Sequence, residues 1–401
     1  MKLNARSIEA IESVGLPVAA LAGALLVFGA FVAFAGKSPL EAWALLFKGA
    51  FGDWFSWQNS LQRAAPLMLT ALCVVIPARA GLTVIGGEGA LVLGGLACAA
   101  VPYLFAPPEN AFGTALLLIA AAAAGAAWIA LVGVLRQWRG VNETISSLLL
   151  AYTAIALFKH VVEGPMRDPA SLNKPSTRTL AEGLRIGGMF GTDIHWGLVF
   201  GVVACAGLGI WLYGTTGGFA TRIVGGNARA ARLVGLPSTR IIVAACAIGG
   251  ACAGLAGGIE VAAVHTNANA SLIAGLGYAG ILVAFVARQN PWGVIPVAIL
   301  FGGFGSAGSL LQRRLDVPDA SVMVLQGVAF LLILASDALR GRLFTPADTS
   351  MPAPVAAPVA APVHAVEAAR AGKAPVVSTP AMPEGGSPIA LAATLAPRQL
   401  S

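Results

Sequence analysis

Long apolar runs separated by short polar stretches dominate the chain between residues 16 and 339. A helix rises about 1.5 Å per residue, so about 20 apolar residues are needed to cross a hydrocarbon core of about 30 Å. The clear runs are 16–35, 112–135, 196–214, 241–262, 293–311 and 321–339; the weaker ones are 61–78, 82–104, 143–162 and 276–287. The pattern predicts an all-α membrane protein, a polytopic helical bundle of about 10 transmembrane helices.

The basic residues test this assignment, because cytoplasmic connections carry an excess of Lys and Arg. If the N-terminus is cytoplasmic, the inner connections hold most of them: Arg79, Arg136, Arg139, Arg222, Arg229, Arg232, Arg240, Arg288, Arg340 and Arg342. Arg313 and Arg314 oppose the assignment. The pattern predicts cytoplasmic N- and C-termini, a periplasmic excursion at 163–195 and a cytoplasmic loop at 215–240.

The two ends of the chain differ in composition from its middle. Residues 1–15 are polar and charged, and we expect a cytoplasmic N-terminal segment. No small-residue cleavage site follows the run 16–35, which favours a retained anchor over a removed signal peptide. Residues 345–401 are rich in Pro and Ala and predict a disordered cytoplasmic tail, in which we assign His364 no role.

Composition agrees with a membrane location. The chain is 57% hydrophobic and 11% charged, with a mean hydropathy of +0.80, which leaves too little polar surface to cover a soluble globule. The net charge of +7 is spread between the apolar runs, so we expect no nucleic-acid partner. The five cysteines and four histidines show no metal-ligand spacing, and no phosphate-binding loop is present. We therefore expect neither a metal, nor a bound cofactor, nor catalysis on this chain.

The inner loop contains its own helix signals. Asn227 is a good N-cap, the following ARAARLV fits a two-turn basic helix, and Gly235 and Pro237 stop it. A short helix of this kind could be a docking element for a partner. A solvated loop whose arginines only set the topology is the alternative.

Glu88 is the most informative charged residue. A carboxylate within an apolar run costs about 2.5–3.5 kcal/mol on insertion scales, so Glu88 is expected to face the bundle interior. Gly86, Gly87 and Gly89 around it would allow a helix or a solute to approach closely. The pattern fits a pathway or gating residue, and the alternative is a structural hydrogen bond between two helices.

Two further carboxylates are less distinctive. Glu143 follows Asn142 at a predicted helix start, where a carboxylate caps a helix or belongs to a gate. Glu260 lies near the outer end of its run, where a structural role is expected.

The stretch GGNARAARLVGLPSTR resembles the coupling segment of ABC permeases of the ribose, nucleoside and branched-chain amino acid type. In that family the segment docks on an ATP-hydrolysing subunit. The resemblance assigns the coupling role to Gly226, Asn227, Ala230, Ala231, Arg232 and Gly235.

Two other stretches are similar to the nucleoside and simple-sugar branch of the same family. TVIGGEGALVLGGLACAA retains Ile85, Gly86, Glu88, Gly89 and Gly94, and GVNETISSLLLAY retains Asn142, Glu143, Ile145, Ser146 and Tyr152. The resemblance covers roughly residues 60–340. It implies a translocation pathway that includes Gly86, Glu88, Gly89, Asn142, Glu143, Ser146 and Tyr152.

The chain departs from this branch at three positions near the implied pathway. Val84, Ala90 and Ala151 stand where the family usually has Asn, Gln and Asn. The loss of three hydrogen-bonding side chains bears on the solute more than on transport itself.

The resemblance implies the permease subunit of an ABC importer in the bacterial inner membrane, with ATP and Mg on a partner ATPase. The other implied partners are a second permease subunit, in a homodimer or heterodimer, and a periplasmic or lipoprotein substrate-binding protein. A nucleoside or simple sugar is the expected solute, and a branched-chain amino acid is the alternative. An ion-coupled secondary transporter or a structural membrane scaffold are the rivals from other classes.

Overall fold

A computed structural model describes residues 5–171, 174–189 and 191–339 of the chain. The chain divides into Met1–Phe344 and Thr345–Ser401, and the described residues all belong to the first unit. The predicted tail at 345–401, with His364, lies outside the described residues.

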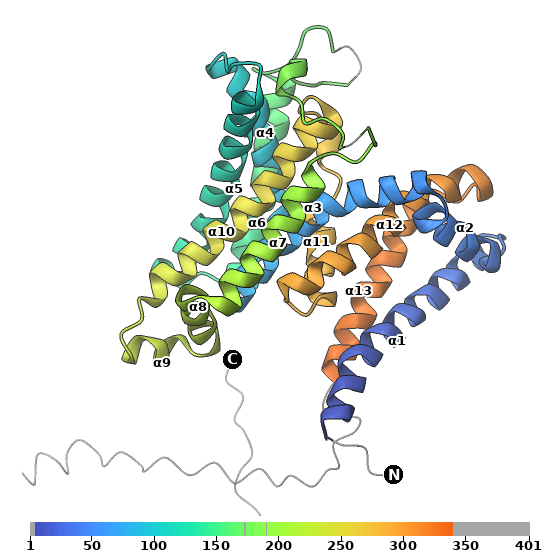
Figure 1. The fold of residues 1–401 in the computed structure, drawn as a ribbon, viewed down its shortest axis with the longest axis horizontal. Helices are drawn as coiled ribbons and strands as arrows, with labels where there is room; N and C mark the ends of the chain where they lie inside the picture. Colours follow the sequence, from blue (N-terminus) through green and yellow to red (C-terminus); the bar gives the residue numbers. More distant parts are fainter. Residues whose placement is uncertain (1–4, 172–173, 190, 340–401) are drawn as a thin grey trace, which may run out of the picture. The chain divides into compact units, whose positions relative to one another are not determined.

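The regular elements of the described part are helices, and Figure 1 shows their arrangement. In chain order the α-helices are α1 (Ala5–Phe34), α2 (Pro39–Phe51), α3 (Trp54–Arg79), α4 (Gly87–Leu104), α5 (Ala111–Arg139), α6 (Glu143–Glu163), α7 (Gly197–Gly214), α8 (Thr216–Gly226), α9 (Ala228–Leu233), α10 (Ser238–Ile259), α11 (Leu276–Val286), α12 (Pro291–Leu315) and α13 (Ser321–Leu339). The short 3-10 helices are η1 (Glu182–Leu184) and η3 (Ala270–Leu272), and η2 (Glu260–His265) is a π-helix that continues α10.

The predicted helical membrane fold is confirmed. Among the described residues, seven helices are long and apolar enough to cross a membrane, and shorter apolar helical segments cover Val18–Phe34, Ala270–Val286 and Ser321–Ser336. Together they correspond one for one to the ten predicted runs. The predicted start of the run 82–104 differs from the structure, because α4 begins only at Gly87, after a turn.

The pattern missed α2 and α8, which are short helices between the apolar runs. Ser38 caps the N-terminus of α2, which begins with Pro39. At 13 residues α2 is about 20 Å long, too short to be recognised as a span. It buries Leu46 and small neighbours, and it packs on α12.

The helices pack in two groups joined through α11. On one side α10 packs along α5, α4 and α3, and on the other α12 packs against α2 while α13 packs against α1. Helix α11 contacts α3 and α4 as well as α12 and α13, and Figure 1 shows it between the two groups. Helix α3 also packs along α12, so the groups share a boundary that runs past α11.

The predicted excursion at 163–195 has little regular structure and is held by backbone hydrogen bonds to η2, which continues α10, and to the residue after it. The N–H of Leu180 donates to the carbonyl of Thr266 at 2.7 Å, and that of Ile186 donates to Ala262 at 2.9 Å. The N–H of Asp193 donates to the side chain of Gln58 on α3 at 2.9 Å. These bonds tie the connection to the helices that it covers.

His195 ends this connection and is 3% exposed. Its Nδ1 accepts a hydrogen bond from the N–H of Gly197, at the start of α7, at 3.1 Å. Burial lowers the pKa of His195 below its ordinary value of about 6.5. The imidazole is therefore neutral at pH 7.

Candidate functional site: a cavity beside a short helix, and an exposed short helix

A cavity of about 530 Å³ lies between α3, α11, α12 and α13. Four side chains that can hydrogen-bond line it: Arg63 of α3, Tyr278 of α11, Asp319 before α13, and Gln326 of α13. The rest of the lining is mostly apolar and includes Leu67, Ile85, Ile281, Phe301 and Phe330. A mostly apolar cavity with a few convergent polar groups is typical of a site for a small solute.

Helix α11, which forms one wall, is too short to cross a membrane. Its 11 residues give a length of about 16 Å, roughly half of a hydrocarbon core of about 30 Å. The helix follows Gly275, which has a left-handed φ of +77°. The free N–H groups at its start need hydrogen-bond partners, as at any helix N-terminus.

Glu88 supplies these partners. Its Oε1 accepts from the N–H of Gly275 at 2.9 Å, and its Oε2 accepts from the N–H of Gly277 at 2.6 Å. The carboxylate is fully buried, and a helix N-terminus favours a negative charge. Glu88 therefore joins the start of α4 to the start of α11, as the structural alternative predicted, and is not itself among the residues that line the cavity.

The backbones of the two helices lie very close together at this point. A Cβ added to Gly277 would overlap the backbone of Glu88. Only glycine fits there, and this close approach lets the short Glu88 side chain reach both N–H groups.

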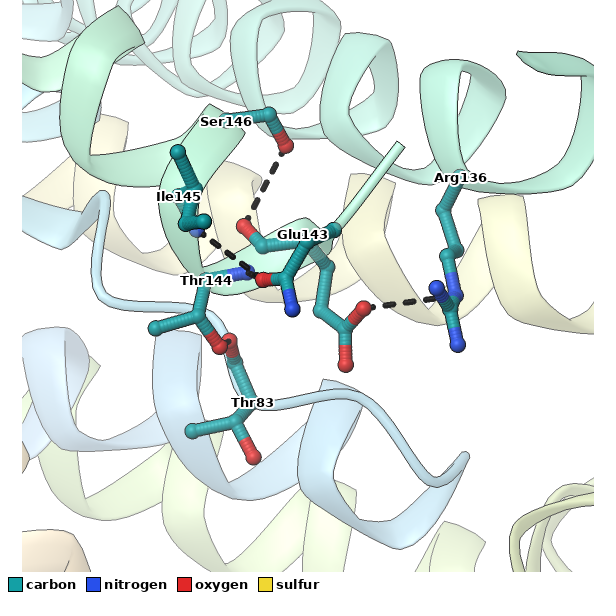
Figure 2. A network of polar contacts seen from close by, with 7 residues as sticks. Thr83, Arg136, Glu143, Thr144, Ile145 and Ser146 are labelled. Carbon is teal, nitrogen blue, oxygen red and sulfur yellow. Dashed lines mark hydrogen bonds and ion pairs between the residues drawn. The ribbon is translucent and has the colours of Figure 1, made fainter. Parts of the chain in front are cut away.

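Asn142 and Ser146 organise the start of α6, which is shown in Figure 2. The Asn142 Oδ1 accepts from the N–H groups of Thr144 and Ile145 at 2.9 and 3.1 Å. The Ser146 hydroxyl donates to the Glu143 carbonyl at 3.2 Å. These are capping contacts of the kind that any helix start can use.

The same helix start holds the turn that precedes α4. The Thr144 hydroxyl donates to the Thr83 carbonyl at 3.0 Å, and the N–H of Ile85 donates to the Ser147 hydroxyl at 3.0 Å. The Glu143 Oε2 lies 3.3 Å from Nε of Arg136 on α5, an ion pair without hydrogen-bond geometry. Since Ile85 lines the cavity, α6 supports its wall from behind.

The other residues that the resemblance placed on the pathway also lie outside the cavity lining. Gly89 packs against α6, where a Cβ would come within 2.7 Å of the Ala151 Cα. Tyr152 is 59% exposed on the outer surface of α6. Val84, Ala90 and Ala151, the three departures from the family, are fully buried. The Asn, Gln and Asn side chains that the family usually has at these positions would therefore lie between packed helices and not in the cavity.

One charged residue in the sequence could have indicated the cavity lining. Arg63 is a charge within the apolar run 61–78, and such a charge usually faces a wet cavity. Arg63 also acts electrostatically on Glu260, whose Oε2 lies 3.7 Å from Nε2 of His265. Glu260 and His265 belong to the π-helix η2, a rare distortion that is frequent at functional sites.

The segment to which the resemblance assigns coupling folds as its sequence predicts. The Asn227 Oδ1 accepts from the N–H groups of Arg229 and Ala230, both at 3.0 Å. Gly235 ends the helix with a φ of +84°, and the N–H of Leu236 donates to the Ala231 carbonyl at 3.0 Å. Both ends of this six-residue helix are thus satisfied locally.

Helix α9 buries one side chain and exposes its apolar tip. Ala231 is fully buried, whereas Leu233 is 89% and Val234 73% exposed. The Arg232 Nε donates to the Ala228 carbonyl at 3.3 Å within the helix. Figure 1 shows α8 and α9 at the end of the bundle where α7 ends and α10 begins. The exposed Leu233 and Val234 were not singled out by sequence.

Comparisons of the sequence find relatives among ABC transporter permeases. The family described as "Branched-chain amino acid transport system / permease component" matches residues 56–334. The glucose ABC transporter permease protein of Haloferax volcanii is 32% identical over 343 residues, which cover 83% of this chain and 90% of the relative. The guanosine ABC transporter permease protein NupP of Bacillus subtilis is 26% identical over 330 residues, covering 80% and 91%. A nucleoside ABC transporter permease protein of Lactococcus lactis is 25% identical over 236 residues, covering 56% and 64%.

Proposed function

The chain belongs to the family of branched-chain amino acid transport system permease components, and we propose that it forms the membrane pathway of an ABC importer for a sugar or a nucleoside. It is a multi-pass transport subunit and not an enzyme. Relatives named for glucose and guanosine transport favour these solutes over a branched-chain amino acid. ATP and Mg bind to a partner ATPase, since this sequence has no phosphate-binding loop.

The exposed tip of α9 is the observation that most directly supports coupling to an ATPase. Leu233 and Val234 expose apolar side chains in a loop that the distribution of basic residues assigns to the cytoplasm. Capping at Asn227 and Gly235 makes the helix rigid enough to transmit a movement of the ATPase to the membrane helices. The coupling residues Gly226, Asn227, Ala230, Ala231, Arg232 and Gly235 thus shape the helix, and the apolar tip contacts the ATPase.

The cavity supplies the pathway in this proposal. A substrate-binding protein delivers the solute from the periplasm, and a second permease subunit completes the importer in the bacterial inner membrane, with both termini of this chain in the cytoplasm. Movement of α9 rocks the helices on either side of α11. Because Glu88 links α4 to α11, the two helices move together, and Glu88 controls access to the cavity by positioning α11.

The experiment compares the importer assembled from this chain, its ATPase and its binding protein with a Leu233→Asp, Val234→Asp variant. We expect solute-stimulated ATP hydrolysis and uptake to fall at least tenfold, because two charges replace the apolar tip. Leu104→Asp, at a 71% exposed leucine at the C-terminal end of α4, is the control. Uptake that survives without the ATPase would instead identify an ion-coupled secondary transporter.

A further inference from the structure

Two opposite charges line the cavity: Arg63 from α3 and Asp319 from the turn before α13. The guanidinium of Arg63 lies against Gly305 of α12, where its Nη1 is 3.5 Å from the position of an added Cβ. The carboxylate of Asp319 occupies the space that a Cβ on Gly308 would fill. Gly305 and Gly308 are three residues apart on one helix, so they lie on the same face about one turn apart. The two charged groups therefore lie against the same face of α12, about one helical turn apart.

Neither charge is neutralised by a close partner. Among the described residues, neither Arg63 nor Asp319 makes an ion pair within 4 Å or a side-chain hydrogen bond. Glu260, on which Arg63 acts electrostatically, is already 3.7 Å from His265 and is only 7% exposed. Arg63 and Asp319 are themselves exposed to the cavity. Their hydrogen-bonding capacity is available to a solute.

We propose that Arg63 and Asp319, with the amide of Gln326 beside them, bind the hydroxyl groups of a sugar ring in the cavity. This inference rests on the proposed function and deepens it, because a hexose and the pentose of a nucleoside share this chemistry. The carboxylate accepts hydrogen bonds from ring hydroxyls, and the guanidinium donates to their oxygens. Gln326 both donates and accepts.

The charge balance of the site also fits a neutral solute. One cation and one anion leave no net charge, so an anionic solute meets Asp319 and a cationic one meets Arg63. The aromatic rings of Tyr278, Phe301 and Phe330 line the same cavity and offer apolar surface to a sugar ring or a base. A zwitterionic amino acid is the competing ligand, because it could match both charges at once.

The test measures uptake by the complete importer with Arg63→Gln and Asp319→Asn. The solutes are radiolabelled glucose with its 2-, 3- and 4-deoxy analogues, guanosine with its 2′- and 3′-deoxy analogues, and leucine. We expect each substitution to lower uptake of the transported sugar or nucleoside about tenfold. For at least one deoxy analogue, a substitution should lower uptake by a smaller factor than it does for the parent solute. That analogue lacks the hydroxyl that the replaced side chain binds, so it has no such hydrogen bond to lose. The binding protein is the same in every sample, so its own selectivity cancels in this ratio.

The matched controls make the same changes of charge at residues outside the cavity. Arg314→Gln and Asp316→Asn alter exposed residues near the end of α12, and Asp316 forms only a 4.0 Å ion pair with Lys37. We expect both controls to transport normally. Uptake of glucose or guanosine that is equal in all variants, or deoxy ratios that never change, would overturn the assignment of Arg63 and Asp319 while leaving the proposed function intact. Uptake of leucine alone by the wild-type importer would overturn the proposed function itself.

Discussion

Replacing Glu88 with alanine tests whether its carboxylate holds the start of α11. The substitution removes two hydrogen-bond acceptors and leaves the N–H groups of the partly buried Gly275 and the buried Gly277 without these partners. Each orphaned donor costs about 1–3 kcal/mol, which gives about 2–6 kcal/mol for the pair. Hydrogen bonds between membrane helices average only about 0.6 kcal/mol in mutant cycles, which gives a lower limit of about 1 kcal/mol.

The geometry decides between these limits. The acceptor is a carboxylate, the distances are 2.6 and 2.9 Å, and the side chain is fully buried. Charged acceptors form hydrogen bonds that are roughly twice as strong as neutral ones. We therefore expect Glu88→Ala to lower the free energy of unfolding by about 2–4 kcal/mol, and Glu88→Gln, which retains one acceptor, by about half as much.

Thermal unfolding of the purified protein in detergent measures the effect as a fall in the apparent Tm. Glu143→Ala is the matched control, because its carboxylate forms one ion pair, with the partly exposed Arg136, and its Oε2 accepts no hydrogen bond, so we expect a smaller loss. Wild-type thermal stability of Glu88→Ala, or an equal loss in Glu143→Ala, would refute the capping argument. A Glu88→Gln variant with wild-type stability and no uptake would instead assign Glu88 a direct role in gating.

Three other substitutions test separate parts of the structure. Gly235→Ala places a side chain at a φ of +84°, at a cost of about 1–2 kcal/mol, and should raise the ATP hydrolysed per solute imported, whereas Gly235→Asn should be tolerated. Gly277→Ala should lower the apparent Tm by several degrees, because its Cβ overlaps the Glu88 backbone, while Gly226→Ala, with open space around it, should not. His195 has a lowered pKa, so below about pH 6.5 the unfolded chain binds a proton that the folded chain does not, and stability falls by at most about 1.4 kcal/mol per pH unit. His195→Asn, which retains an acceptor for Gly197, should show a smaller fall in Tm between pH 7.5 and 5.5.

The spans were predictable because the length of an apolar run is a local property that the bilayer thickness fixes. Helix α9 was predictable for a similar reason, since Asn227 and Gly235 satisfy its ends within the segment. Helix α2 was not, because its 13 residues bury their apolar face on α12, which lies far along the chain. The cavity also was not, because its lining comes from α3, α11, α12 and α13 and depends on how they pack.

Glu88 and Arg63 show that the sequence alone does not distinguish a buried structural charge from a charge that faces a cavity. Both are charges within apolar runs, and insertion costs predict only that each avoids lipid. Glu88 is fully buried because α11 begins beside it and offers two backbone donors from a segment 187 residues further along the chain. Arg63 meets the glycine face of α12, which offers it no hydrogen-bond partner and leaves its guanidinium exposed to the cavity. The same local signal therefore marks a structural cap in one helix and a solute-binding group in the other, and the neighbouring helix decides between them.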